Sequence, residues 1–261
     1  MRVKPKKHLG QHFLKDESVC ARIAESITRP LDCENILEIG PGTGALTKHI
    51  LSSDPFRRYY VMEVDTESIN YLGTHFPNLS SDQIINGDFL AYDALSLFNG
   101  SPFIVVGNFP YNISSQILFK CLEYKSNIPE IVGMFQKEVA ERISQGPGKK
   151  QYGILSVFMQ AYYDIEYLFT VDEHVFEPPP KVKSGVIRCI RNKRESLGCD
   201  EAFFKKVVKT AFNQRRKTLR NSLKSISNGR DLPVHFSGER PEQLSVDEFI
   251  ELTLFFEARI N

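Results

Sequence analysis

Glu38-Ile-Gly-Pro-Gly-Thr-Gly-Ala45 joins an apolar segment, residues 35–39, to a segment with helical periodicity that begins near Gly44. Its three glycines let the backbone approach a ligand closely. Gly40, Gly42 and the final alanine also satisfy the dinucleotide-binding spacing, and Glu63 follows about 20 residues later, where an acidic side chain can hold ribose hydroxyls. The segment therefore predicts a cofactor that carries a nucleoside, either NAD or S-adenosylmethionine.

Segments rich in β-branched and aromatic residues alternate with segments of helical periodicity. We predict strands over residues 35–39, 59–63, 83–85, 103–106 and 131–135, and helices that begin near Gly44, Thr66, Ile113 and Lys137. This alternation is typical of an α/β fold in which helices cover both faces of a mostly parallel sheet and ligands bind at the carboxyl ends of the strands. A helix over 154–163 and an antiparallel pair of strands over 164–171 and 185–190 complete the predicted Rossmann-like domain.

The chain changes character after about Arg194, where strand patterns disappear. We predict two amphipathic helices there. The first follows Asp200 as N-cap and carries an apolar face that runs from Phe204 to Leu223. The second follows Ser245, which forms a capping box with the glutamate three residues later. We therefore predict a catalytic domain over residues 1–194 and a small all-helical domain over 195–261.

Polar side chains follow successive predicted strands. Glu63 comes after the second strand, Asp88 after the third and Asn108 after the fourth. Together they supply an acceptor for a ribose, an acceptor for the amino group of a cofactor adenine, and a residue for the reacting group. This layout favours S-adenosylmethionine, because a nicotinamide enzyme needs an acid–base pair beside a hydride path and the sequence offers none. An NAD-dependent oxidoreductase remains an alternative.

Asn108-Phe-Pro-Tyr111 combines an amide, a proline and an aromatic ring where an apolar run ends. An exocyclic amino group on a flat base is a poor nucleophile, and an enzyme that alkylates it must accept hydrogen bonds from its N–H groups. Asn108 offers an amide oxygen, Pro110 a carbonyl and Tyr111 a face for stacking. A plain turn is the structural alternative. Phe176, at the start of a triple-proline segment, is either a core residue or a second stacking surface.

Composition excludes several classes of protein. The chain has 261 residues, 41% hydrophobic and 25% charged, which is ordinary for a globular protein. Its five scattered cysteines indicate reduced thiols, and its six histidines show no metal-ligand spacing, so we expect no metal site. Neither a secretion signal nor a membrane-spanning run is present in the sequence, and we expect a cytoplasmic protein without membrane association.

Positive charge is concentrated in two places although the formal net charge is only +1. Residues 181–225 contain 14 Lys and Arg against 3 acidic residues, and a basic cluster opens the chain before Asp16. Solvated surface explains a single basic run. Two clusters in an otherwise acidic chain favour a polyanionic partner, which would be bound through its phosphates.

These residues resemble the class I S-adenosylmethionine-dependent rRNA adenine N6,N6-dimethyltransferases, and in particular the small-subunit branch of that family. The matching segments run from the N-terminus into the predicted helical domain, and their ordered co-occurrence is more specific than any one motif. They are Lys7-His-Leu-Gly-Gln-His-Phe-Leu14, Glu38-Ile-Gly-Pro-Gly-Thr-Gly44, Gly87-Asp88, Gly107-Asn-Phe-Pro-Tyr-Asn-Ile-Ser114, Phe176-Glu-Pro-Pro-Pro-Lys-Val182 and Phe212-Asn-Gln-Arg-Arg-Lys-Thr-Leu219.

The resemblance implies a monomeric enzyme with S-adenosylmethionine as methyl donor. Its implied substrate is N6 of two adjacent adenosines in the 3′-terminal hairpin loop of 16S rRNA, within an immature small ribosomal subunit. The residues implied for donor binding are His12, Leu14, Gly40, Gly42, Glu63, Asp88 and Asn108. The residues implied for catalysis are Asn108, Pro110, Tyr111 and Phe176, with the target base between the two aromatic rings. We expect rRNA phosphates to be bound by Lys6, Lys7, Arg215, Arg216, Lys217 and Arg220.

The sequence departs from the family pattern at two positions. The family usually has asparagine where His12 stands and leucine where Phe109 stands. We expect Phe109 to face away from the base. Two related functions remain open: a 23S rRNA adenine N6-methyltransferase of the macrolide-resistance type, and an RNA-binding assembly factor whose essential role is not catalysis.

Overall fold

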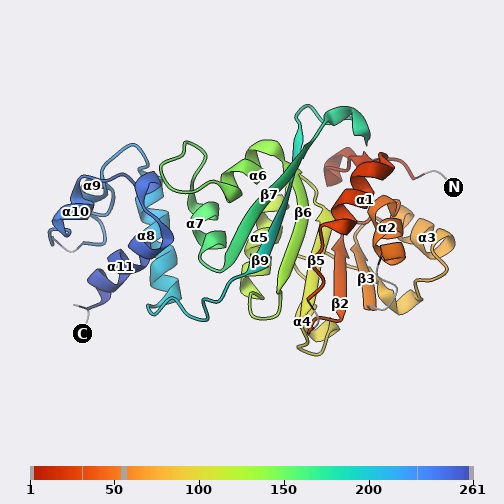
Figure 1. Ribbon diagram of the computed structural model, residues 1–261, viewed down its shortest axis with the longest axis horizontal. Coiled ribbons are helices and arrows are strands. Elements are labelled where there is room, and N and C mark those ends of the chain that lie inside the picture. The colour runs from red at the N-terminus through yellow and green to blue at the C-terminus, as the bar shows by residue number, and fades with distance from the viewer. Residues whose placement is uncertain (1–2, 31, 54–57, 228, 259–261) are drawn as a thin grey trace. The chain divides into compact units, whose positions relative to one another are not determined.

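The computed structural model describes residues 3–30, 32–53, 58–227 and 229–258 (Figure 1). The chain divides into two compact units. Residues 1–140 and 165–191 form the first, which we call the sheet unit, and residues 141–164 and 192–261 form the second, the helical unit. The helical unit thus takes in a segment from the middle of the sequence. The predicted domain boundary after residue 194 stays a prediction.

The sheet has seven strands within the described residues, in the order β4-β3-β2-β5-β6-β9-β7. The strands are β2 (Asn35–Ile39), β3 (Arg58–Glu63), β4 (Ile84–Asn86), β5 (Phe103–Asn108), β6 (Glu130–Gln136), β7 (Tyr163–Val171) and β9 (Ser184–Arg191). Neighbours from β4 to β6 are parallel, and β9 is antiparallel to β6. The mostly parallel α/β sheet is therefore confirmed, and β9 and β7 are hydrogen-bonded neighbours at one edge, as expected.

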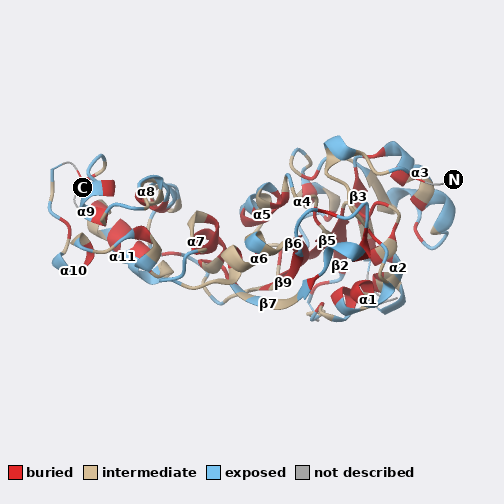
Figure 2. Cartoon of the chain, turned by 90° about the horizontal axis from the view of Figure 1, so that it is seen from above, coloured by how far each residue is buried: buried red, intermediate tan, exposed pale blue. Residues whose placement is uncertain are grey.

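Helices cover both faces of the sheet. Figure 2 shows α1 (Glu17–Glu25) and α2 (Ala45–Ser53) on one side, with α4 (Ala94–Leu97) and α5 (Ser114–Glu123) on the other. Two further helices, α3 (Thr66–His75) and α6 (Lys137–Ser144), follow β3 and β6. Apolar side chains of α1, α2 and the strands form one buried core, because each strand between two helical layers is shielded from water on both faces.

Helix α1 and a small two-stranded sheet were not predicted. Asp16 caps α1, because its side chain accepts hydrogen bonds from the backbone N–H groups of Ser18 (2.9 Å) and Val19 (3.1 Å). Just before it, β1 (Phe13–Leu14) pairs antiparallel with β8 (Phe176–Glu177). Short 3-10 turns lie at Lys7–Leu9, Ser81–Gln83 and Glu173–Val175. The β1–β8 pair fixes the N-terminal segment beside the triple-proline segment.

The helical unit contains α7 (Ile154–Gln160), α8 (Glu201–Asn213), α9 (Leu219–Ser222), α10 (Val234–Ser237), a 3-10 turn at Pro241–Gln243 and α11 (Val246–Glu257). Both predicted caps are confirmed. Asp200 accepts a hydrogen bond from the backbone of Phe203 (2.6 Å). Ser245 accepts one from the N–H of Glu248 (3.2 Å), whose carboxylate accepts one from the N–H of Ser245 (2.7 Å).

The prediction of one continuous helix from Asp200 to Leu223 is wrong. Helix α8 ends at Asn213, and a turn follows in which the N–H of Lys217 donates to the carbonyl of Gln214 (2.8 Å). Thr218 then adopts an extended backbone (φ −65°, ψ 156°) that begins a separate helix. Both α8 and α9 bury apolar side chains, so hydrophobic periodicity alone did not mark the break between them.

All five cysteines lie within the described residues, and none forms a disulfide. Cys20, Cys33, Cys121 and Cys189 are buried in the sheet unit, and Cys199 is half-buried in the helical unit. Within the described ranges, every helix is too short or too polar to cross a membrane.

Candidate active site

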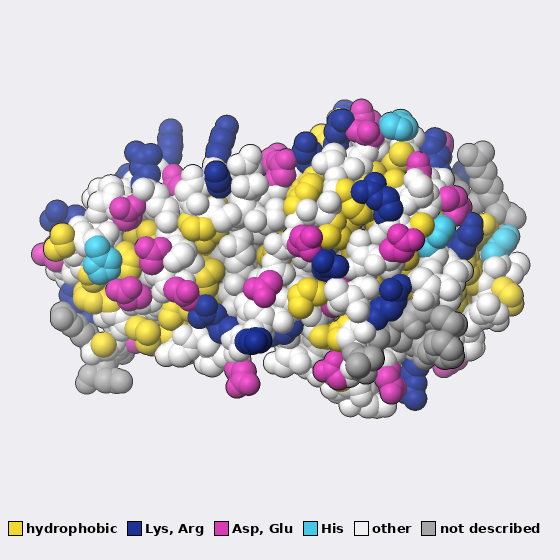
Figure 3. All heavy atoms as spheres, in the orientation of Figure 1, with side chains coloured by type: hydrophobic (Ala, Val, Ile, Leu, Met, Phe, Trp, Pro, Cys, Tyr) yellow, Lys and Arg dark blue, Asp and Glu magenta, His cyan; other side chains and the backbone are white. Residues whose placement is uncertain are grey.

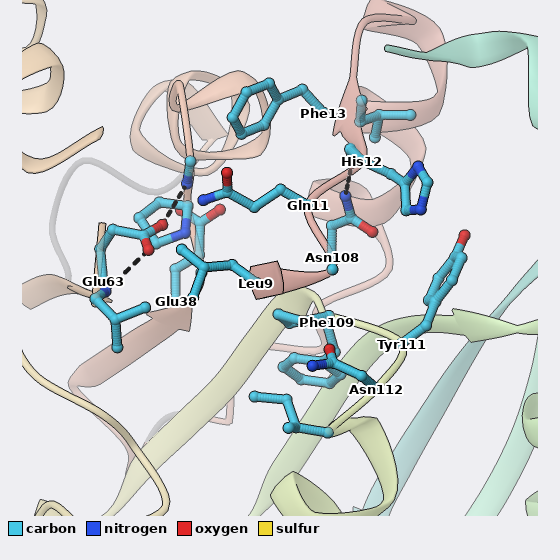
Figure 4. A pocket seen from close by; sticks show the side chains of 18 of the residues that line it. Leu9, Gln11, His12, Phe13, Glu38, Glu63, Asn108, Phe109, Tyr111 and Asn112 are labelled. Atoms are coloured by element: carbon cyan, nitrogen blue, oxygen red, sulfur yellow. Dashed lines mark hydrogen bonds between the residues drawn. The ribbon is translucent and has the colours of Figure 1, made fainter. Parts of the chain in front are cut away.

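A cavity of about 320 Å³ lies in the sheet unit at the carboxyl ends of β2, β3 and β5. The strand ends supply Glu38, Glu63 and Asn108, and the N-terminal segment, residues 8–14, forms another wall (Figure 4). Polar side chains that the sequence places far apart thus meet at one edge of a parallel sheet, as the fold requires.

The glycine loop after β2 is the backbone cradle of this cavity. Gly40, Gly42 and Gly44 have φ angles of +68°, +56° and +78°, which side-chain-bearing residues rarely adopt. A Cβ at Gly42 would lie 2.8 Å from the ring of Phe13, and one at Gly44 would lie 2.4 Å from the ring of Phe76. Glycine is therefore favoured here for two reasons: the positive φ angles, and the lack of room for a Cβ at Gly42 and Gly44.

Glu63 is held rigidly at the end of β3. One carboxylate oxygen, Oε2, accepts a hydrogen bond from the N–H of Gly42 (3.0 Å), and the other, Oε1, accepts from those of Val64 (2.9 Å) and Asp65 (3.0 Å). Burial raises the pKa of the carboxyl, while these donors oppose the rise. Oε1 thus already accepts two hydrogen bonds, while Oε2 can accept a further one, so the side chain fits a ribose hydroxyl.

Glu38 is a cavity residue that the sequence analysis missed. Only 1% of it is exposed, and its Oε2 accepts hydrogen bonds from Thr47 Oγ1 (2.6 Å) and from the hydroxyl of Tyr59. Burial raises the pKa of the carboxyl to about 7. The available signal was a single acid inside the apolar strand that leads into the glycine loop.

Asp88 and Leu14 both line the cavity. Asp88 is exposed, and its Oδ1 accepts a hydrogen bond from the N–H of Leu90 (2.9 Å), the turn-capping contact expected of an isolated aspartate. Leu14 is buried in β1 and contributes an apolar wall. The structure therefore brings the sequence-predicted donor residues to one cavity, while their contacts with the donor stay predictions.

Asn108 has one side of its amide already engaged. Its Nδ2 donates a hydrogen bond to the main-chain carbonyl of His12 (2.9 Å), which leaves Oδ1 to accept. The carbonyl of Pro110 accepts a bond from the N–H of Ile113 (3.2 Å) and has a second lone pair for another donor. The two predicted acceptors for an amino group thus lie in one short turn.

The aromatic residues predicted for the target base differ in exposure. Tyr111 is partly exposed at the cavity, and its hydroxyl hydrogen-bonds to Ser184 Oγ (2.6 Å). Phe176 is 0% exposed, belongs to the apolar core and does not line the cavity. Its β8 position opposite Leu14 places it in that core. A stacking role for Phe176 stays a prediction that requires its ring to be uncovered.

Phe109 occupies the floor of the site. Its fully buried ring lies over Gly107 and Gly133, which face each other on β5 and β6, and it makes an edge-to-face contact with Phe135 (5.1 Å between centroids). This packing anchors the turn that carries Asn108 and Pro110.

The N-terminal lysines predicted to bind RNA differ in their surroundings. Lys6 is paired with Asp65 and lies 3.3 Å from a carboxylate oxygen of Glu67. Lys7 is exposed in the following 3-10 turn. Lys6 therefore fastens the N-terminal segment to the start of α3, which leaves Lys7 the better placed of the two for a phosphate.

The basic residues after α8 also differ in their surroundings. Arg215 donates a hydrogen bond to the carbonyl of Lys150 (2.6 Å) and lies 3.7 Å from Glu242, so its head is engaged within the helical unit. Arg216 and Lys217 are exposed. Arg220, likewise exposed, lies 3.8 Å from Asp231. Figure 3 shows Lys and Arg side chains standing out along the upper edge of the part that contains α8 and α9.

Comparison with known proteins adds a separate line of support. A family model described as ribosomal RNA adenine dimethylase matches residues 2–253. The chain belongs to this family. Ribosomal RNA small subunit methyltransferase A of Bacteroides thetaiotaomicron is 58% identical over 254 residues, covering 96% of this chain and 93% of that protein. The protein of the same name from Flavobacterium johnsoniae is 56% identical over 259 residues, covering 98% and 97%.

Two solved structures have the same fold. A dimethyladenosine transferase from Plasmodium falciparum superposes with a TM-score of 0.79 at 22% identity, covering 95% of this chain and 98% of that one. The 23S rRNA methyltransferase ErmE gives 0.67 at 24% identity, covering 94% and 99%. The predicted class I methyltransferase fold, the enzyme class and S-adenosylmethionine as cofactor are thereby confirmed.

Proposed function

We propose that this protein dimethylates N6 of two adjacent adenosines in the 3′-terminal hairpin loop of 16S rRNA during biogenesis of the small ribosomal subunit. Relatives more than half identical over nearly the whole chain are named ribosomal RNA small subunit methyltransferase A, which supports the choice of rRNA and subunit. We further propose that it acts in the cytoplasm, as a monomer, on an immature subunit.

The orientation of the Asn108 amide is the observation that carries this proposal. Because Nδ2 is bound to the carbonyl of His12, Oδ1 is the atom that can accept a hydrogen bond from an incoming amino group. The carbonyl of Pro110 offers the second acceptor in the same turn. Two acceptors beside the partly exposed ring of Tyr111 match the N–H groups and the flat ring of an adenine.

The residues of the cavity fit S-adenosylmethionine. The glycine loop leaves no room for a Cβ at Gly42, and the Glu63 carboxylate is fixed where a ribose hydroxyl would bind. When bound, S-adenosylmethionine supplies an electrophilic methyl carbon on a sulfonium. Asn108 Oδ1 and the Pro110 carbonyl hold the adenine N6 for attack on that carbon, so positioning and hydrogen-bond acceptance provide most of the acceleration.

Dimethylation places a further demand on the same acceptors. The amino group loses its proton after the first attack, and only one N–H remains for Asn108 and Pro110 together. The monomethylated amine must therefore rotate so that its lone pair again faces the donor. Tyr111, held through its hydroxyl by Ser184, can keep the base in plane while the amino group turns.

Asn108→Ala tests the proposal. We expect single-turnover methylation of unmethylated small ribosomal subunits to be lost, while affinity for RNA stays within about twofold, because the alanine removes an acceptor and no phosphate contact. Asn86→Ala is the matched control, since Asn86 is an exposed amide at the end of β4 that does not line the cavity. An unchanged single-turnover rate in Asn108→Ala would refute the assignment.

Mass spectrometry of rRNA identifies the substrate. A strain that lacks the gene should lose N6,N6-dimethyladenosine from 16S rRNA and regain it with the wild-type gene but not with Asn108→Ala. Loss of the modification from 23S rRNA instead would favour the alternative methyltransferase. Full rescue of subunit assembly by Asn108→Ala would favour the assembly-factor role.

A further inference from the structure

His12 lies where three parts of the active site meet, and its side chain has no role in the function proposed above. Its main-chain carbonyl accepts the hydrogen bond from Asn108 Nδ2 (2.9 Å). Its ring nitrogen Nδ1 lies 2.8 Å from the carbonyl oxygen of Pro178. Its ring also stacks on that of Tyr111, with 5.5 Å between centroids and 27° between planes.

We propose that His12 is a positioning residue for the target base, whose ring supports Tyr111 and whose backbone orients Asn108. The inference rests on the proposed function and deepens it, because it assigns the imidazole to the base and not to the methyl donor. Figure 4 shows His12 and Tyr111 on one side of Asn108, whereas Glu63 and Glu38 lie on the other.

The position of His12 follows from strand register. In the antiparallel β1–β8 pair, Phe13 lies opposite Glu177, which brings the preceding residue, His12, next to Pro178. A carbonyl oxygen can only accept a hydrogen bond, so Nδ1 carries the proton and donates to Pro178. The imidazole is thereby fixed at one edge, and its face is presented to Tyr111.

Tyr111 is consequently held at two points. Its hydroxyl is bound to Ser184 Oγ (2.6 Å), and one face of its ring lies against the imidazole of His12. Ser184 is fully buried on β9, so the hydroxyl end is anchored to the sheet. With one face supported, the other face remains for the base, and the ring cannot tilt freely when the base arrives.

The carbonyl and the ring of one residue therefore place both catalytic side chains. Displacement of His12 would release the amide of Asn108 and the ring of Tyr111 together. Because reacting atoms misplaced by about 1 Å can cost roughly 100-fold in rate, a residue that touches neither reactant can still control turnover.

Three substitutions separate the contributions of His12. His12→Phe keeps a ring for stacking but loses the hydrogen bond to Pro178. His12→Asn keeps an N–H donor but loses the ring, and His12→Ala loses both. For each we would measure single-turnover methylation of unmethylated small ribosomal subunits, the Kd for S-adenosylhomocysteine by calorimetry, and Tm.

We expect a fall in single-turnover rate of roughly 10- to 100-fold for His12→Ala, with partial recovery in His12→Phe and His12→Asn. The Kd for S-adenosylhomocysteine should stay within about twofold in all three, which a general structural defect would not produce. A Kd weakened tenfold or more at an unchanged rate would show that the imidazole binds the donor and would overturn the inference. Unchanged rates in all three variants would overturn it as well.

The wild-type protein distinguishes failure of the proposed function from failure of the role of His12. If it fails to methylate 16S rRNA in unmethylated small ribosomal subunits, the proposed function is wrong. If it methylates these subunits and His12→Ala does so equally fast, the proposed function stands and the role of His12 is wrong.

Discussion

Replacing Gly133 with alanine would place a methyl group against the ring that anchors the catalytic turn. A Cβ built at this position lies 2.2 Å from Cε2 and 2.8 Å from Cδ2 of Phe109, and 2.9 Å from Cε2 of Phe135. Favourable carbon–carbon contacts are about 3.5–4.0 Å, so the Phe109 ring would have to move by more than 1 Å. Both rings are fully buried, and protein interiors are close-packed, so a shift of this size disturbs their neighbours.

We expect two effects of Gly133→Ala. Overpacking of this kind costs about 1–3 kcal/mol, and the clash with two buried rings places the loss of unfolding free energy at the upper end of that range. Displacement of Phe109 also shifts its neighbours Asn108 and Pro110, so the single-turnover rate should fall by more than the loss of folded protein explains.

Urea unfolding and single-turnover methylation measure the two effects separately. Phe109→Leu shortens the side chain that the new methyl group meets, so the double variant should recover much of both losses. A double-mutant cycle would report that coupling. Gly146→Ala is the control, because a Cβ there meets nothing within 4 Å. The reasoning would be refuted by a Gly133→Ala variant as stable as Gly146→Ala, or by a double variant no better than Gly133→Ala.

The remaining predictions concern charge and capping. The folded-state pKa of Glu38, about 7, exceeds its ordinary 4.5, so its stabilisation is complete below pH 4.5 and is lost as the pH rises through 7. In wild type the free energy of unfolding should fall by up to roughly 3 kcal/mol between pH 5 and 7.5 because of this group, and Glu38→Gln should remove that fall, as measured by urea unfolding. Arg216→Glu with Lys217→Glu should weaken rRNA binding and flatten its salt dependence in filter-binding titrations. Arg216→Lys with Lys217→Arg conserves the charge and should preserve the slope of log affinity against log salt concentration. Ser245→Ala should lower Tm, because it removes a helix cap that stabilises the protein by about 1 kcal/mol. An unchanged Tm would show that the cap does not stabilise the protein.

Local signals predicted the fold well. The strand over Asn35–Ile39 and the glycine loop after it follow from short-range patterns, and so do the caps at Asp200 and Ser245. The break between α8 and α9 was missed, because the apolar periodicity continues across it although the backbones of Gln214 and Thr218 both depart from the helix.

Strand ends accounted for part of the candidate site. Glu63, Asp88 and Asn108 were found because parallel strands end at one edge of the sheet. Glu38 was missed because its partners, Thr47 and Tyr59, become neighbours only after folding. The pairing of Lys6 with Asp65 could not be predicted either, since a charge run gives no indication of a partner 59 positions away.

The distribution of the cysteines gives the protein built-in reporters of local opening. The reactive species of cysteine is the thiolate, and burial raises the pKa of Cys20 to about 12 and that of Cys199 to about 11. Four thiols lie in the sheet unit and one in the helical unit. The rate at which each cysteine is alkylated at neutral pH, measured by peptide mass spectrometry, would therefore report how often each unit opens locally. No engineered label is needed.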